Sequence, residues 1–452
     1  MFAQYPKQIA YIVGNEACER FSYYGMRSIL VVYMTTFLLI PENEAKAVYH
    51  LFISAGYFLT LLGGFIADRY LGKYQTIIYF SLVYCLGHAV LAMGETQTFL
   101  YWGLALIALG AGGFKPCVST HVGDQFHQGN KHLLEKVFEI FYWMTNLGAF
   151  ASSFLIPIIL PKYGPGWAFG IPGILMALAT LIFWMGRKYY VYVPPSGKAE
   201  SSHFFAILFY AIRNLGKKQK GSSWLDTAKA AYASEKVEAT KAAMDVFKVL
   251  VFISAFWALY DQQGSTWVLQ AERMNPFFLG FQILPAQIQA VNPLMLLLLV
   301  PVFSVYLYPA MKRLGFCRTP IAKMKWGMWA TVLAFLSVAA IEVGLKTQQL
   351  NIGWVLIPCA LISAAEIMVS ITGLEFAYTQ APRSMKSTIM SLFFLTIFIG
   401  NFFTAFFSWL DRFSGLNEIL FYTGMMAVVS TFFGVIASRY KERNYVEPHS
   451  VG

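Results

Sequence analysis

The chain of 452 residues is 57% hydrophobic and only 13% charged, whereas soluble globular proteins carry about 25% charged residues. This composition excludes an ordinary soluble protein and predicts one that crosses a membrane several times. The formal net charge is +11, but the basic residues fall between apolar segments, which indicates membrane topology and not a nucleic-acid partner. The five cysteines are scattered without a CxxC pair, so neither a disulfide framework nor a zinc site is indicated.

Hydropathy and length predict about twelve membrane-spanning helices. The expected spans are 14–39, 46–70, 74–94, 98–123, 136–161, 168–188, 246–272, 285–313, 320–344, 351–379, 384–411 and 416–440. Basic residues gather at alternate connections between these spans, which by the positive-inside rule places both termini in the cytoplasm. The first residues show no cleavage-site pattern, so we expect the first helix to act as an uncleaved insertion signal.

One long polar stretch divides the chain into two halves of six helices each. The halves are residues 1–188 and 246–452, and the stretch between them, 189–245, contains prolines at 194 and 195, a basic run at 217–220 and an Ala/Lys/Glu-rich segment near 223–240. We expect it to be a cytoplasmic linker, because it is short for a separate domain. Two six-helix bundles joined in this way predict alternating access around a site near the middle of the membrane.

The first predicted helix carries an unusual number of polar side chains for a membrane span. On a helical wheel these share one broad face and are Glu16, Glu19, Arg20, Tyr23, Tyr24 and Arg27. Each charge at mid-membrane costs roughly 3 kcal/mol, so this face should line a polar cavity. The alternative is a structural Glu16–Arg20 pair, which leaves Glu19 and Arg27 unpaired.

Four charges in the predicted spans, Arg27 among them, can be compared by depth. Lys115 and Glu366 each lie roughly sixteen residues into helices that run from outside to inside, about 24 Å of rise. Arg27 and Asp261 lie roughly fourteen residues into helices that run outward. Each level pair joins the two halves, so both can form ion pairs. The alternative for Lys115 is a lysine that reaches back to the inner interface, and Glu375 falls on the opposite helix face from Glu366, where we expect a structural role.

The predicted cavity has one more acid than base. Its bases are Arg20, Arg27 and Lys115, and its acids are Glu16, Glu19, Asp261 and Glu366. A buried carboxylate without a cation favours a bound proton, as a proton-coupled carrier requires.

The segment Glu16-x-x-Glu19-Arg20-Phe21-Ser22-Tyr23-Tyr24-Gly25 resembles the ExxERFxYYG motif of the proton-dependent oligopeptide transporters. Residues 64–73 resemble the loop motif of the major facilitator superfamily, and 110–116, 123–126, 141–148, 256–265 and 370–376 resemble the later motifs of the transporter family, in family order. The resemblance implies an all-α membrane protein of the major facilitator superfamily fold. It also implies a proton-coupled symporter that imports di- and tripeptides by alternating access.

The resemblance also implies residue roles. Proton coupling would involve Glu16, Glu19, Arg20, His50 and Asp261; peptide binding would involve Arg20, Tyr23, Tyr24, Tyr57, Lys115, Asn146, Trp257, Asn292 and Glu366. Arg27–Asp261 would close an outer gate and Lys115–Glu366 an inner one. The alternative for His50 is an ordinary interfacial histidine. The chain departs from the family pattern at Thr145, where isoleucine is usual, and at Asp261, where glutamate is frequent.

The same resemblance predicts a monomer in a bacterial inner membrane, with protons as the coupling ion, no metal and no other cofactor. Two rival functions remain. A carrier of nitrate or another small metabolite could share the fold but would not need Glu366. A membrane-embedded enzyme is disfavoured, because His50 and His88 are isolated and neither HExxH nor GxSxG occurs.

Overall fold

The computed structural model describes residues 5–127, 129–195, 200–217, 222–316, 319–380, 382 and 385–440. The helices are α1 (Lys7–Val32), α2 (Glu42–Ile66), α3 (Lys73–Met93), α4 (Gln97–Asp124), α5 (Leu134–Met185), α6 (Glu200–Arg213), α7 (Ser234–Leu250), α8 (Ile253–Tyr260), α9 (Thr266–Glu272), α10 (Val291–Val302), α11 (Tyr308–Arg313), α12 (Pro320–Leu345), α13 (Leu356–Glu366), α14 (Thr372–Thr379), α15 (Lys386–Trp409) and α16 (Gly415–Arg439). Single π-helical turns continue α1, α2, α10 and α13 at Tyr33–Phe37, Ala67–Leu71, Phe303–Leu307 and Ile367–Ile371.

The described helices give twelve membrane crossings. Nine helical runs are long and apolar enough to span, and Ser234–Leu250 with Ile253–Glu272, bent by 43°, makes a tenth. One of the nine contains α5, whose 52 residues break at Gly164 (φ 82°, ψ 173°); at roughly 1.5 Å per residue it is long enough to cross twice. The twelfth is α1, which the apolarity criterion misses because of its charged side chains.

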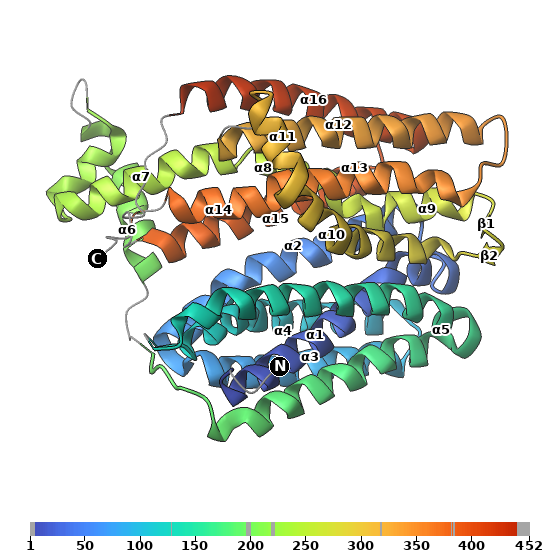
Figure 1. Cartoon of the computed structure of the whole chain (residues 1–452), viewed down its shortest axis with the longest axis horizontal. Coiled ribbons are helices and arrows are strands. Elements are labelled where there is room, and N and C mark those ends of the chain that lie inside the picture. The colour runs from blue at the N-terminus through green and yellow to red at the C-terminus, as the bar shows by residue number, and fades with distance from the viewer. Residues whose placement is uncertain are drawn as a thin grey trace.

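The helices form two groups that lie side by side (Figure 1). Buried apolar side chains make one large cluster within α1–α5 and a second within α7–α16. Within the first group α2 and α4 approach closely, because a Cβ on Gly63 would overlap the backbone of Gly112 and Gly113. Between the groups, α2 packs on α15 and α5 packs on α10, so the seam runs along these helices.

The linker contains helical structure of its own. Helix α6 and the 3₁₀ turn Trp224–Ala230 pack together around Ile207 and Leu225. Lys229 and Lys241 lie 2.8 and 2.6 Å from the Asp226 carboxylate, and these contacts hold the pKa of Asp226 well below its usual range. Helix α7 begins within the stretch assigned to the linker. Of the predicted linker features, residues 196–199 and 218–221 lie outside the described residues.

Two details differ from the sequence-based expectation. The first helix starts at Lys7, not near residue 14, because the apolar stretch before Gly14 continues the helix and buries Ile9, Ile12 and Val13. A short antiparallel hairpin, β1 (Phe277–Phe278) and β2 (Phe281–Gln282), interrupts the all-α pattern between α9 and α10. Leu279 and Gly280 both have positive φ, which is the backbone of a tight two-residue hairpin turn.

Candidate functional site

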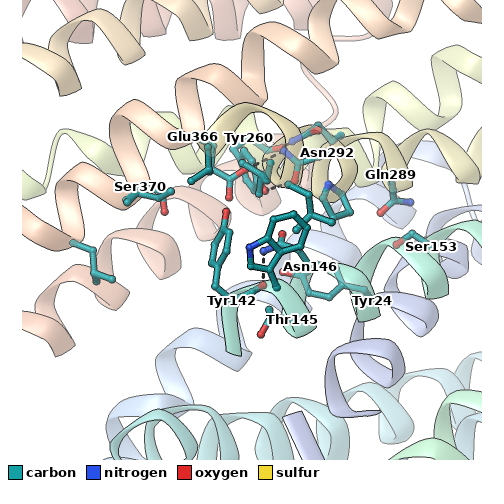
Figure 2. A pocket seen from close by; sticks show the side chains of 18 of the residues that line it. Tyr24, Tyr142, Thr145, Asn146, Ser153, Tyr260, Gln289, Asn292, Glu366 and Ser370 are labelled. Atoms are coloured by element: carbon teal, nitrogen blue, oxygen red, sulfur yellow. Dashed lines mark hydrogen bonds between the residues drawn. The ribbon is translucent and has the colours of Figure 1, made fainter. Parts of the chain in front are cut away.

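A cavity of about 1000 Å³ lies at the seam between the two helix groups. Its volume is at the upper end of the range for small-molecule sites. The lining side chains come from both groups, and the polar ones include Tyr24, Arg27, Tyr142, Asn146, Tyr260, Gln289, Asn292, Glu366 and Ser370. Figure 2 shows Tyr24 and Tyr142 facing Asn292, Tyr260 and Glu366 across this space. The cavity also reaches Glu135 and Glu139 near the start of α5.

On one side of the cavity the Asn292 side chain holds the Glu366 carboxylate in place. Its amide nitrogen donates to Glu366 Oε2 at 2.9 Å and to Ser363 Oγ at 3.0 Å, and its amide oxygen accepts from the Tyr260 hydroxyl at 3.1 Å. Glu366 ends α13 where the π-helical turn Ile367–Ile371 begins, a feature frequent at functional sites. No cation lies within ion-pair distance of Glu366 among the described residues, so this carboxylate is available to a bound ammonium group or a proton.

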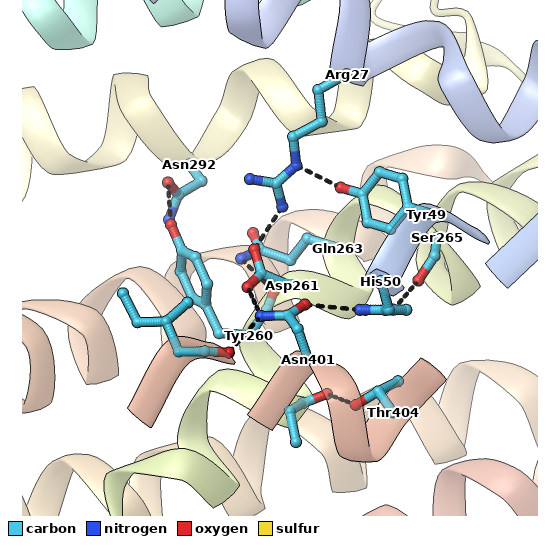
Figure 3. A network of polar contacts seen from close by, with 12 residues as sticks. Arg27, Tyr49, His50, Tyr260, Asp261, Gln263, Ser265, Asn292, Asn401 and Thr404 are labelled. Carbon is cyan, nitrogen blue, oxygen red and sulfur yellow. Dashed lines mark hydrogen bonds and ion pairs between the residues drawn. The ribbon is translucent and has the colours of Figure 1, made fainter. Parts of the chain in front are cut away.

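An ion pair that joins the two halves includes Arg27, which lines the cavity (Figure 3). Arg27 Nη2 lies 2.5 Å from Asp261 Oδ1, and Arg27 Nε donates to the Tyr49 hydroxyl at 2.6 Å. Arg27 belongs to α1 and Asp261 to the 3₁₀ turn after α8, so the pair joins the two halves. This is the contact expected from counting depth along the predicted helices; its gating role stays a prediction.

His50 is tied into the same network. Asn401 Nδ2 donates to Asp261 Oδ2 at 2.7 Å, which leaves the amide oxygen of Asn401 facing His50 Nδ1 at 2.8 Å. Because that oxygen only accepts, Nδ1 carries a proton, and Nε2 faces the Ser265 hydroxyl at 2.9 Å. The ring is 0% exposed, so His50 is not an interfacial side chain.

The two acids of the α1 motif both pair with an arginine of the same helix. Arg20 Nε lies 3.0 Å from Glu16 and 2.5 Å from Glu19, and all three side chains are buried or nearly so. Both acids therefore share one arginine. None of the three lines the cavity, and direct contact of Arg20 with a substrate stays a prediction.

Lys115 lies against aromatic rings, and no acid of the described residues lies within ion-pair distance of it. Its ammonium lies 3.8 Å from the centre of the Tyr23 ring and 4.8 Å from that of Tyr57, which is cation–π geometry. The ammonium has no hydrogen-bond partner among the described atoms, and Lys115 forms no ion pair with Glu366. The expected inner pair is thus absent here, because Glu366 is held by Asn292 on the far side of an open cavity.

Of the nine expected peptide-binding residues, the cavity brings together four: Tyr24, Asn146, Asn292 and Glu366. Arg20, Tyr23, Tyr57, Lys115 and Trp257 are not among its lining residues, and Tyr23 and Trp257 are only 3% and 6% exposed.

Sequence reasoning missed Tyr142, Tyr260, Gln289 and Asn401. Tyr142 could have been found, since it lies one helical turn before Asn146 on the same face. Tyr260 adjoins Asp261, although adjacent residues point in different directions on a helix. Asn401 lies in a helix that also carries several serines and threonines, so its type alone did not distinguish it.

Comparison with known proteins gives a consistent result. The sequence profile of the POT family matches residues 74–411. Human solute carrier family 15 member 2 is 40% identical over 361 residues, which cover 75% of this chain and 49% of that protein. The chain therefore spans about half the length of the curated relatives it matches.

Solved structures match over nearly the whole chain. The POT family transporter PepTSo superimposes with a TM-score of 0.90 at 36% identity, covering 96% of this chain and 98% of that one. A structure described as an auto-inhibited POT family peptide transporter has a TM-score of 0.90 at 37% identity and covers 98% and 99%. These likenesses extend to both helix groups and the seam between them.

Proposed function

The chain belongs to the POT family, and on this premise we propose that it is a proton-coupled symporter that imports di- and tripeptides by alternating access. The observation that carries the proposal is the cavity at the seam. It is closed on its outer side by the Arg27–Asp261 ion pair and offers the Glu366 carboxylate without a cationic partner. This supports an inside-facing state of a carrier in which Lys115 and Glu366 are apart.

The cavity suits a short peptide. A dipeptide extends roughly 7 Å at about 3.5 Å per residue. Its ammonium would pair with Glu366, and its backbone amide would bond to Asn146, Asn292 or a neighbouring tyrosine. We propose that Lys115, whose ammonium has no acidic partner, turns from the rings of Tyr23 and Tyr57 to hold the terminal carboxylate. Recognition of charged termini and backbone tolerates varied side chains.

Coupling would arise from competition for the same acids. A proton or a peptide ammonium that neutralises Glu366 removes the attraction between Glu366 and Lys115, so the inner ends stay apart. Protonation within the Asp261–Asn401–His50 network would likewise weaken the outer Arg27–Asp261 pair, while Glu16 and Glu19 share Arg20. A membrane potential of 100 mV supplies about 2.3 kcal/mol per proton, enough for roughly fifty-fold accumulation.

The setting of the protein is part of the proposal. We infer a monomer in a bacterial inner membrane with both termini in the cytoplasm, which uses protons as coupling ion and no other cofactor. An enzymatic function finds no support in a family of transporters. Nitrate is a poor fit, because the charged cavity lining consists of Glu135, Glu139, Glu366 and the already paired Arg27.

Glu366→Gln tests the role of the acid. Dialanine binding by the purified protein, measured calorimetrically, should weaken at least about tenfold, since a charge-assisted contact to the ammonium is lost. Glu375→Gln is the matched control: it makes the same change on α14, at an exposed acid outside the cavity lining, and should bind as the parent does. Unchanged dialanine binding by Glu366→Gln would contradict the proposed peptide site.

A further inference from the structure

A second buried ion pair joins the two halves at their outer ends. Lys46 Nζ lies 2.6 Å from Glu418 Oε2, and each side chain is only 6% exposed. Lys46 lies in the first two turns of α2 and Glu418 in the first turn of α16. We propose that Lys46 and Glu418 form a second outer gate, which must break each time the outer ends of the two halves separate.

The burial of this pair is what makes it a gate and not a surface contact. Removing two charges from water is expensive, and the cost is offset only while the charges face each other. When the halves separate at this end, both charges regain water. The pair is therefore strong only in the closed arrangement, and loss of one partner leaves the other buried without compensation.

A neighbouring contact joins the same ends of the two halves. The Asn43 amide donates to the Asp411 carboxylate, and Asp411 lies in the loop between α15 and α16. Two successive points at the start of α2 thus contact the outer ends of the opposite half. One turn further along α2, His50 contacts Asn401 and Ser265, so the outer end of α2 is held by three elements of the opposite half.

Because of the surrounding charges, we expect loss of Lys46 and loss of Glu418 to have unequal effects. Glu418 also interacts electrostatically with Glu42, from the first half, and with Asp411, from the second. Lys46 therefore offsets part of the negative charge of three acids drawn from both sides of the seam, and Arg273 also interacts with Glu42. Without Lys46, like charges would face each other across the seam and favour opening, so loss of the lysine should open the outer ends more than loss of Glu418.

The inference rests on the proposed alternating access, and its test measures conformation without transport. Spin labels at Glu95 and Gln348, exposed residues at the outer ends of the two halves, report the separation by double electron–electron resonance. The labels are attached to cysteines introduced at these two positions, in a protein whose five native cysteines have been replaced. Lys46→Gln should raise the population with a longer outer distance at least about tenfold, and Glu418→Gln should raise it less.

The matched control is Glu342→Gln. The Glu342 side chain is also 6% exposed, and its carboxylate pairs with Arg273 at 2.7 Å. Unlike Lys46 and Glu418, these two residues belong to the same half. This variant should leave the distance unchanged. The charge swap Lys46→Glu with Glu418→Lys should restore the parental distribution, which a merely misfolded single variant could not do.

Three outcomes would overturn the inference. They are an unchanged distance distribution in Lys46→Gln, an equal shift in Glu342→Gln, and a swap that fails to restore the parental distribution. Failure of the proposed function is distinguishable, since a parent protein that moves no dialanine can still be scored for these distances.

Discussion

At the scale of single residues, Asn401 connects the outer ion pair to the buried histidine. Its amide donates to Asp261 Oδ2 and to the Ile397 carbonyl, and accepts from His50 Nδ1. The side chain is 0% exposed. A change of protonation at His50 would therefore reach Asp261 through one amide group, which couples the titratable residue to the contact that closes the cavity.

Asn401→Leu should uncouple this network. The nearly isosteric side chain leaves Asp261 Oδ2 and His50 Nδ1 buried without partners, which costs about 1–3 kcal/mol. We expect a lower melting temperature and loss of most proton-driven uptake of dialanine, with peptide exchange less affected.

Thr404→Val is the control for Asn401→Leu. Thr404 lies one turn further along α15, donates to the carbonyls of Ala258 and Gly400, and contacts neither Asp261 nor His50 by a hydrogen bond. The prediction is wrong if both variants retain driven uptake to the same degree.

The sequence predicted the chemistry of these residues better than their contacts. Depth along the predicted helices identified Arg27 and Asp261 as partners, and the bend before α8 and the 3₁₀ turn at Asp261 did not separate them. The same count paired Lys115 with Glu366, which lie apart here. Helical position fixes height in the membrane, whereas contact also depends on how the two halves are tilted, which no local pattern encodes.

At the scale of elements, the reversal within α5 depends on one residue. Gly164 has φ 82° and ψ 173°, a region open almost only to glycine. Nothing lies within 4 Å of a Cβ placed there, so any cost of a side chain is conformational. The break divides one long helical run into two membrane crossings and sets the angle between them.

Gly164→Ala should destabilise the protein by about 1–3 kcal/mol through backbone strain alone. Gly170→Ala is the matched control, since Gly170 is helical and its added Cβ would meet Ala92 at an ordinary 3.9 Å; it should be neutral or slightly stabilising. Thermal unfolding in detergent measures both. Equal melting temperatures for the two variants would show that the break does not require a glycine.

Element positions followed from hydropathy, but their ends did not. The spans were correctly placed because apolar runs of this length have few alternatives in a membrane. The start of α1 and the hairpin 277–282 were missed because both are apolar in composition: apolarity alone does not fix where a helix begins, nor does it distinguish a short strand from a helical end. The break before α8 was missed for a related reason, since α7 and α8 together read as one continuous span.

At the scale of the whole molecule, the ion pairs between the two halves gather at the end away from the linker. Arg27–Asp261, Lys46–Glu418 and the His50 network all lie on that side, while the cavity extends toward the start of α5. This asymmetry is the expected signature of one end state of alternating access. The family and fold could be predicted from motif order, whereas the conformational state could not, because one sequence must stabilise both end states within a few kcal/mol.

The most direct test of the account is uptake of labelled dialanine by proteoliposomes that contain the purified protein. With an inward proton gradient and an inside-negative potential, we predict accumulation above the external concentration, up to roughly fifty-fold for one proton at 100 mV. The accumulation should collapse when a protonophore is added. Absence of dialanine movement in both driven and exchange modes would contradict the peptide site, and accumulation that survives the protonophore would contradict proton coupling.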